Sequence, residues 1–317
     1  MFTNAEPSPW LLPIFAGNKA VILFFVLSGY VLSLPYWAGK RVAYRKYLIK
    51  RICRIYLPYL AALLLAVVVG GRLLYANLNL SSWFYGTWHT PFNAGLIVRQ
   101  VLFASHQSQV GAINTAFWSL RYEMEMSLVF PLVCWILLRL DLRVALLLTL
   151  GLELAGMGHL RLPYEMQRTV LWGSAFIFGA IMAKERLRII AWYDSRSTAG
   201  RYVLCGAVIA GFYYGGFGTE AINIPAACGV IMLTECCRAR LWLSHSAAEY
   251  LGRISYSLYL VHGTVLFATF ILLYGKIPAW TVVSIAILAS FGISHLFCTW
   301  VEMPTIALGK TLTYDKQ

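Results

Sequence analysis

Nine long apolar segments determine what this chain can fold into, because a water-soluble domain cannot bury so much apolar surface. A helix that spans a membrane needs about 20 mostly apolar residues, since at about 1.5 Å per residue it crosses the ~30 Å hydrocarbon layer with every backbone group bonded internally. The sequence therefore predicts an all-α fold, a polytopic transmembrane helix bundle of about nine spans. The predicted spans cover residues 20–37, 56–75, 116–139, 142–157, 168–184, 201–217, 221–236, 250–274 and 277–302.

Composition supports this prediction and excludes other classes of protein. The 317 residues are 60% hydrophobic and 12% charged, whereas about a quarter of the residues in a soluble globular domain are charged. The net charge is +13, but the basic residues flank the apolar segments and form no solvated patch, so no nucleic-acid partner is expected. The seven cysteines occur without a CxxC pair or zinc spacing, which predicts no metal site.

The distribution of Lys and Arg between alternate loops predicts the orientation. Short loops rich in these residues stay in the cytoplasm, and 19 of the 26 basic residues fall on one side of the predicted membrane and 7 on the other. We therefore expect an extracytoplasmic N-terminal segment (1–19), one membrane domain (20–304) and a cytoplasmic tail (305–317). Residues 1–18 lack the features of a signal peptide, so we also expect that an upstream span is missing from this chain.

A basic run at 40–54 follows the first predicted span on the cytoplasmic side. Such a run commonly anchors lipid headgroups and determines topology. The alternative is a cradle for the phosphates of an anionic cofactor, for which Lys50, Arg51 and Arg54 are the candidates on successive helical turns. Glu302, near the cytoplasmic end of the last predicted span, is expected to form a structural ion pair with Arg51 or Arg54.

Ionisable residues inside apolar segments are costly and are therefore candidates for function. The third predicted span begins with WSLRYEME, which places Arg121 and Glu125 four residues apart, where they can pair and order the helix. That pair does not account for Glu123. We therefore regard Glu123, with Ser119 on the neighbouring face, as a candidate for lining a polar cavity.

A second polar cluster lies in the predicted span 250–274. Ser255, Tyr259 and His262 share one helical stripe there, with Tyr256 adjacent. An imidazole has an unperturbed pKa of about 6.5, so it exchanges protons near neutral pH and suits general acid or base catalysis. The alternative is a histidine that donates one hydrogen bond across helices.

Four separated strings, taken together, resemble one protein family. They read FFVLSGYVLS at 24–33, RICRIYLPY at 51–59, WSLRYE at 118–123 and ISYSLYLVH at 254–262, and Glu302-Met303-Pro304 follows them. In order and spacing they resemble membrane acyltransferase family 3, which contains O-antigen and exopolysaccharide O-acetylases. The resemblance implies a helical bundle of ten spans in the bacterial cytoplasmic (inner) membrane. It also implies transfer of an acyl group, usually acetyl from acetyl-CoA, to hydroxyls of glycans, lipid-linked sugars or small molecules.

Carried onto this chain, the resemblance implies binding roles for particular residues. Lys50, Arg51 and Arg54 would hold the acyl-CoA donor from the cytoplasmic side, and Ser28 and Gly29 would line the passage of the acyl group. No metal would take part. The expected partners are membrane lipid and the glycan or other hydroxyl acceptor.

The resemblance also implies a catalytic set, but with a gap. Glu123, Tyr259 and His262 would shape the reaction cavity. In the family, the first span carries an Arg followed by a His that activates the acceptor hydroxyl, and nothing before residue 20 supplies either. Ile22 stands where many members have an Asp. The general base is therefore lost, encoded upstream, or replaced by His262.

Two functions from different classes follow. The first is an integral-membrane acyltransferase that moves an acyl group from acyl-CoA to a hydroxyl. The second is a non-catalytic membrane translocator or scaffold derived from the same family, in which the intramembrane Glu and His form a proton relay. The second function would show no dependence on CoA.

Overall fold

The computed structural model describes residues 17–73, 87–88, 91–105, 109, 111–214, 220–236 and 245–314. Within these ranges the chain is helical and forms no β-strand, apart from one isolated bridge between Tyr274 and Ile277. The chain divides into two compact units. Unit 1 draws its described residues from 45–124 and 246–314, and unit 2 from 17–44 and 125–245.

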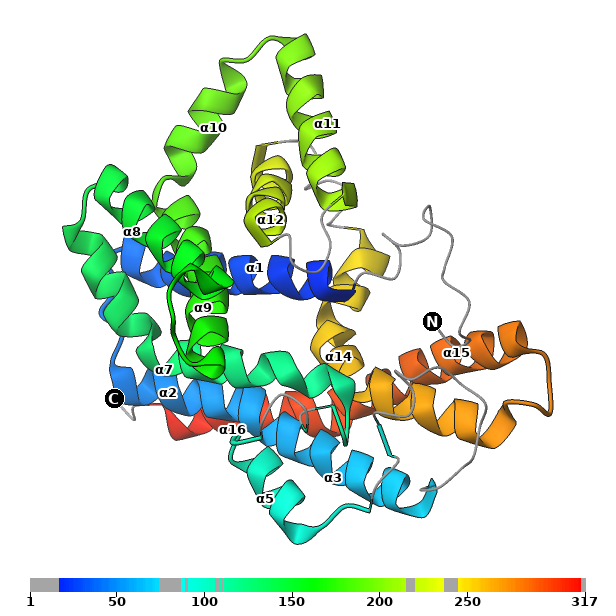
Figure 1. Cartoon of the computed structure of the whole chain (residues 1–317). Helices are drawn as coiled ribbons and strands as arrows, with labels where there is room; N and C mark the ends of the chain where they lie inside the picture. Colours follow the sequence, from blue (N-terminus) through cyan, green and yellow to red (C-terminus); the bar gives the residue numbers. More distant parts are fainter. Residues whose placement is uncertain are drawn as a thin grey trace. The chain divides into compact units, whose positions relative to one another are not determined.

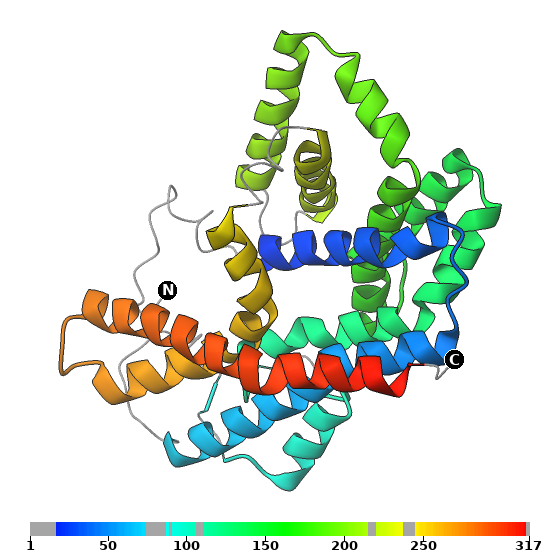
Figure 2. The same ribbon diagram turned by 180° about the vertical axis from the view of Figure 1, so that it is seen from behind.

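Unit 1 is built around a helical hairpin and a long helix from the basic run. In the hairpin, α14 and α15 lie side by side and are joined by a short turn (Figures 1 and 2). The core between α3, α14 and the start of α7 contains Tyr59, Phe117 and Leu260, all buried. The elements of unit 1 are α2 (Tyr44–Arg51), η1 (Ile52–Tyr56), α3 (Leu57–Leu73), α5 (Ala94–Val101), η2 (Thr115–Phe117), the start of α7 (Trp118–Arg139), α14 (Ser246–Leu273), α15 (Ala279–Phe297), η4 (Cys298–Glu302) and α16 (Met303–Leu312).

Two π-helical segments interrupt the long helices of unit 1. η1 joins α2 to α3 in one continuous helix of 30 residues, and η4 joins α15 to α16 in another of 34 residues. α16 packs against η1, and Gly309 makes this possible, since a Cβ atom at that position would lie 2.9 Å from Cβ of Cys53. Short π-segments occur frequently at functional sites. Here η1 carries most of the RICRIY string and η4 ends at Glu302.

Unit 2 is organised by the crossing of α1 and α9. A Cβ atom at Gly29 would overlap the backbone carbonyl of Phe176, and one at Gly179 would overlap that of Val26, so glycine at both positions lets the two backbones touch. Ile22 is fully buried on α1. The elements of unit 2 are α1 (Gly17–Trp37), the rest of α7, α8 (Leu142–Leu154), η3 (Ala155–His159), α9 (Tyr164–Lys184), α10 (Arg186–Asp194), α11 (Thr198–Tyr214) and α12 (Glu220–Cys236).

This crossing predicts opposite effects for two glycine substitutions. Gly29→Ala is expected to lower the free energy of unfolding by about 1–3 kcal/mol or more, because the added methyl group overlaps backbone rather than a movable side chain. Gly151→Ala on α8 meets nothing within 4 Å and is expected to raise it by about 0.5–1 kcal/mol, because alanine restricts the unfolded chain. Chemical denaturation in detergent measures the free energy of unfolding of both variants. If Gly151→Ala destabilised the protein as much as Gly29→Ala, the packing argument would be contradicted.

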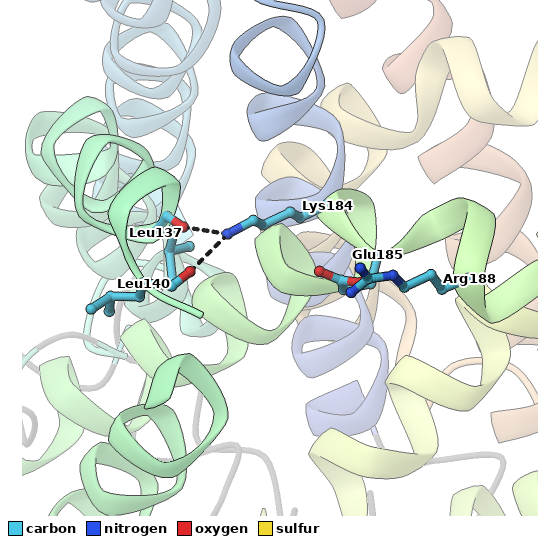
Figure 3. Close-up of polar contacts among 5 residues, drawn as sticks. All are labelled: Leu137, Leu140, Lys184, Glu185 and Arg188. Carbon is cyan, nitrogen blue, oxygen red and sulfur yellow. Dashed lines mark hydrogen bonds and ion pairs between the residues drawn. The ribbon is translucent and has the colours of Figure 1, made fainter. Parts of the chain in front are cut away.

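Lys184 ties the end of α9 to the end of α7. Its ammonium donates to the carbonyl oxygens of Leu137 at 2.5 Å and Leu140 at 3.1 Å (Figure 3). These carbonyls lie at the end of α7, where the helix leaves acceptors without internal partners. The next residue, Glu185, accepts a hydrogen bond of 2.8 Å from Arg188, whose side chain is 77% exposed. Lys184 therefore stabilises a helix end, whereas the neighbouring ion pair joins an exposed arginine to a glutamate whose side chain is only 12% exposed.

The predicted helical fold is confirmed, but the number of nine spans is not. Within the described residues each predicted segment overlaps a helix, and five of the described helices are long and apolar enough to cross a membrane. α7 is not among them, because its 22 residues carry four charged side chains. α16 continues as a helix to Leu312, so the first part of the predicted tail is helical. The five candidate spans are Gly17–Trp37, Tyr44–Leu73, Leu142–His159, Ser246–Leu273 and Ala279–Leu312.

Candidate functional site

Tyr259 links α14 to the segment that opens α7. Its hydroxyl donates to the carbonyl oxygen of Ala116 at 2.5 Å, and the Ser119 hydroxyl lies 2.6 Å away. A phenol has one hydrogen, so Ser119 is the donor in the second contact. Ser119 is buried at the first turn of α7. The structure therefore brings Tyr259 of α14 and Ser119 of α7 together. One chain of hydrogen bonds runs from Ser119 through Tyr259 to the Ala116 carbonyl oxygen.

His262 presents ring nitrogen Nδ1 to its own helix, and Nε2 forms no hydrogen bond with the residues that the structure describes. Nδ1 lies 3.0 Å from the Leu258 carbonyl oxygen and 2.9 Å from that of Tyr259. Carbonyl oxygens only accept, so the ring carries its hydrogen on Nδ1 and the lone pair on Nε2. The ring is half-buried and lies 6.0 Å from the Tyr259 ring. The predicted alternative, a hydrogen bond across helices, does not describe Nδ1, whose acceptors belong to α14.

The predicted stripe on α14 is only partly realised. Ser255 is exposed and donates to the Gly252 carbonyl oxygen of its own helix at 2.8 Å, so it turns away from the other two residues. Tyr256 instead donates to the Ile55 carbonyl oxygen at 2.9 Å, which joins α14 to η1. A π-segment leaves carbonyl oxygens with irregular partners, so a hydroxyl from a neighbouring helix has an acceptor there.

Glu123 forms a buried ion pair with Arg51. Oε1 of Glu123 lies 3.0 Å from Nη2 of Arg51, and the two side chains are 5% and 10% exposed. Within the described ranges, Oε2 of Glu123 is buried and has no hydrogen-bond partner. The charge of Glu123, which was predicted to line a polar cavity, is thus compensated by Arg51, which was predicted to bind CoA. Glu125, its neighbour on α7, accepts a hydrogen bond of 2.8 Å from Thr169 in unit 2.

Glu302 takes a hydroxyl partner. Oε2 accepts a hydrogen bond of 2.5 Å from Ser257, and both residues are buried. The sequence predicted an ion pair between Glu302 and Arg51 or Arg54. Arg51 pairs with Glu123 instead, whereas the Arg54 guanidinium is close enough to Glu302 for an electrostatic interaction. Ser257 was missed by sequence reasoning, because nothing in the spacing links it to a residue 45 positions away.

The remaining predicted cofactor residues fall into two groups. Lys50 and Arg54 are exposed, whereas Arg51 is buried. Their role in holding CoA stays a prediction. Ser28 and Gly29 lie on α1 in unit 2. Packing against α9 accounts for the glycine, and their role in passing an acyl group stays a prediction.

The comparison with protein families decides the identity of the chain. A family model described as an acyltransferase domain, that of acyltransferase family 3, matches residues 2–299. The chain belongs to membrane acyltransferase family 3. The predicted resemblance is therefore confirmed over nearly the whole chain. No curated protein and no solved structure shows a significant match to it.

Like Ser257, Asn114 of this acyltransferase is a buried residue that sequence reasoning missed. Asn114 is fully buried, and its side-chain oxygen accepts from the backbone N–H of Ala116 at 2.9 Å. An asparagine just before a helix is a recognisable N-cap signal, so this contact could have been predicted. Its amide also donates to the carbonyl oxygen of Leu260 on α14. The sequence could not have predicted this second contact, because it joins residues 146 positions apart.

Proposed function

We propose that this membrane protein transfers an acyl group, acetyl in the first instance, from acyl-CoA to a hydroxyl of a glycan, a lipid-linked sugar or a small molecule. The donor enters from the cytoplasm, the C-terminus lies on the same side, and the membrane is a bacterial cytoplasmic membrane. Family membership supports acyl transfer. The observation that carries the proposal is the free Nε2 of His262, held on an apolar helix beside the Tyr259–Ser119 pair.

The free nitrogen suits the proton transfer that the reaction requires. Nε2 of His262 takes the proton of the acceptor hydroxyl while its oxygen attacks the thioester carbonyl carbon. A C–O bond forms, the C–S bond breaks, and the imidazolium returns the proton to the departing CoA sulfur. Nδ1–H stays on the backbone carbonyls of Leu258 and Tyr259, which keep the ring in one orientation. Lys50 and Arg54 would hold the CoA phosphates through charge-assisted contacts.

The purified full chain in detergent or nanodiscs tests this function. We expect the thiol of CoA to be released from acetyl-CoA only when a hydroxyl acceptor is added, with the acetyl group recovered on the acceptor by mass spectrometry. Glycan fractions, lipid-linked sugars and small alcohols are compared as acceptors. The translocator alternative predicts no thiol release and, in proteoliposomes, movement of an unmodified glycan; that result would overturn the proposal.

Removing the two exposed cations is expected to weaken donor binding. Lys50→Ala with Arg54→Ala should raise the Kd for acetyl-CoA about tenfold or more at low salt, because two charge-assisted contacts are lost. The loss should shrink as salt rises, since the Debye length falls from about 10 Å at 0.1 M to about 3 Å at 1 M. Titration calorimetry in detergent at both salt concentrations measures the effect.

The matched control removes two exposed cations from the other predicted side of the membrane. Arg161 and Lys276 are exposed and lie in loops predicted to be extracytoplasmic. Arg161→Ala with Lys276→Ala changes the net charge by the same amount. An equal loss of affinity for acetyl-CoA would show a general charge effect, and the role of Lys50 and Arg54 would then be limited to determining topology.

A further inference from the structure

Asn114 uses both polar atoms of its side chain, and its amide nitrogen contacts α14. Its amide nitrogen lies 3.1 Å from the Leu260 carbonyl oxygen and 3.2 Å from the Thr264 hydroxyl, and donates to both. Its oxygen accepts from the N–H of Ala116 at 2.9 Å. Asn114 is completely buried, and a buried amide of this kind is costly to leave without partners. The side chain is therefore held in one orientation.

A glycine on α14 allows Asn114 to approach this closely. A Cβ atom at Gly263 would lie 2.5 Å from the Asn114 oxygen, closer than real Cβ atoms come to other atoms. Gly263 directly follows His262 in the sequence. The Asn114 side chain therefore packs against the backbone of α14 at Gly263, next to His262. It is also hydrogen-bonded to Leu260 and Thr264, which lie before and after Gly263 on the helix.

The segment that carries Asn114 is itself anchored. The Trp88 indole donates to the Ile113 carbonyl oxygen at 2.7 Å, and the Trp88 N–H donates to that of Ala112 at 3.1 Å. On the other side, the Ala116 carbonyl oxygen accepts from the Tyr259 hydroxyl. The segment 112–116 is thus fixed on both sides, and its contacts with α14 fall at four positions around His262, namely 259, 260, 263 and 264.

We propose that Asn114 is a positioning residue that fixes the turn of α14 carrying His262 and so orients the free Nε2. Its part in acyl transfer rests on the function proposed above, whereas its effect on the orientation of His262 does not. Asn114 acts through Leu260, Gly263 and Thr264, and it needs no contact with substrate. A displacement of about 1 Å of a catalytic group can cost about 10²-fold in rate, so loosening this turn is expected to matter.

The experiment compares Asn114→Ala, Gly263→Ala and the double variant. The first readout is the rate at which diethyl pyrocarbonate modifies His262, because this reagent attacks the free nitrogen of a neutral imidazole; peptide mass spectrometry reports each histidine separately. We expect the rate at His262 to change about threefold or more in Asn114→Ala. His295, which contacts Tyr250 on the same unit, serves as the internal control and should not change.

The double variant tests the contact itself. Gly263→Ala alone should also change the His262 rate, because its methyl group overlaps the Asn114 amide. In the Asn114→Ala background that methyl group has room, so Gly263→Ala should add little. Residues in direct contact show such non-additive effects, whereas independent sites add. Additive effects, or an unchanged His262 rate in a folded Asn114→Ala protein, would overturn the proposal.

Two further measurements separate orientation from stability and from the proposed function. Thr264→Val removes one acceptor with little change in volume, and it and Gly263→Ala carry the test should Asn114→Ala not fold. In the transfer assay, kcat should fall while KM for acetyl-CoA stays within about twofold. A change at His262 in a wild-type chain that transfers no acyl group would leave the positioning role intact and refute the proposed function alone.

Discussion

Acyl transfer by the His262→Ala variant is expected to fall about 10²- to 10⁴-fold, the contribution that a positioned general base makes. The reason is the arrangement of the ring, whose Nδ1 hydrogen is held by the carbonyl oxygens of Leu258 and Tyr259 while Nε2 keeps its lone pair. The loss should appear in kcat, because the base acts in the transition state and is not needed to hold the donor. The amount of variant in the membrane should not change.

His295→Ala is the matched control for this experiment. His295 lies on α15 in the same unit, and its Nδ1 is 3.2 Å from the Tyr250 hydroxyl, away from the Tyr259–Ser119 pair. We expect its transfer rate to stay within about threefold of the wild-type rate, a change of less than about 1 kcal/mol in activation free energy. Full activity in His262→Ala would remove His262 from the reaction and assign the base to another residue.

The second large effect concerns stability. Glu123→Leu is expected to lower the free energy of unfolding by about 3–5 kcal/mol, because it removes a carboxylate that compensates the buried charge of Arg51. The Arg51–Glu123 double variant, with Met and Leu in their places, should recover most of this loss, since apolar side chains of similar volume fit a dry site at least as well. Chemical denaturation in detergent, followed by tryptophan fluorescence, measures all three proteins.

The ion pair between Arg188 and Glu185 in Figure 3, whose arginine is exposed, provides the comparison. Arg188→Ala breaks an ion pair of nearly the same length, 2.8 Å against 3.0 Å, but the Arg188 side chain is 77% exposed. Exposed pairs contribute about 0–1 kcal/mol, because water and salt screen them. A cost for Glu123→Leu as small as that of Arg188→Ala would show that the Arg51 guanidinium reaches water once its partner is gone.

The buried pair also changes how the basic run is tested. Arg51 was predicted beside Lys50 and Arg54 as a ligand of CoA, yet its guanidinium points inward to Glu123. Removing Arg51 therefore perturbs folding before it reports on donor binding. The exposed Lys50 and Arg54 are the sharper probes, and comparing them with Arg51 separates the affinity for CoA from the stability of the site.

Much of the fold follows from local sequence, for a physical reason. In lipid every backbone group must be bonded within its own segment, so an apolar run of sufficient length is a helix whatever it packs against. Within the described residues, all nine predicted segments overlap helices for this reason. The count of spans is a different matter, because it depends on the few charged residues that a helix such as α7 can carry when neighbours compensate them.

In the candidate site, too, the sequence predicts some features and not others. Residue type and position alone singled out Glu123, Tyr259 and His262, because ionisable and hydroxyl side chains are rare and costly in apolar helices. Their partners lie too far away in sequence for any spacing rule. Glu123 meets Arg51 across 72 positions, and Tyr259 meets Ser119 across 140.

The sequence by itself therefore determined the helical class, the family and the identity of the polar residues, since each depends on composition and order within short segments. Only the tertiary structure decided the rest. It showed that Arg51 faces inward, that Gly29 serves a helix crossing, and that Asn114 rests on Gly263. Each of these depends on which backbones approach one another, and that is a property of packing between segments, which no single segment encodes.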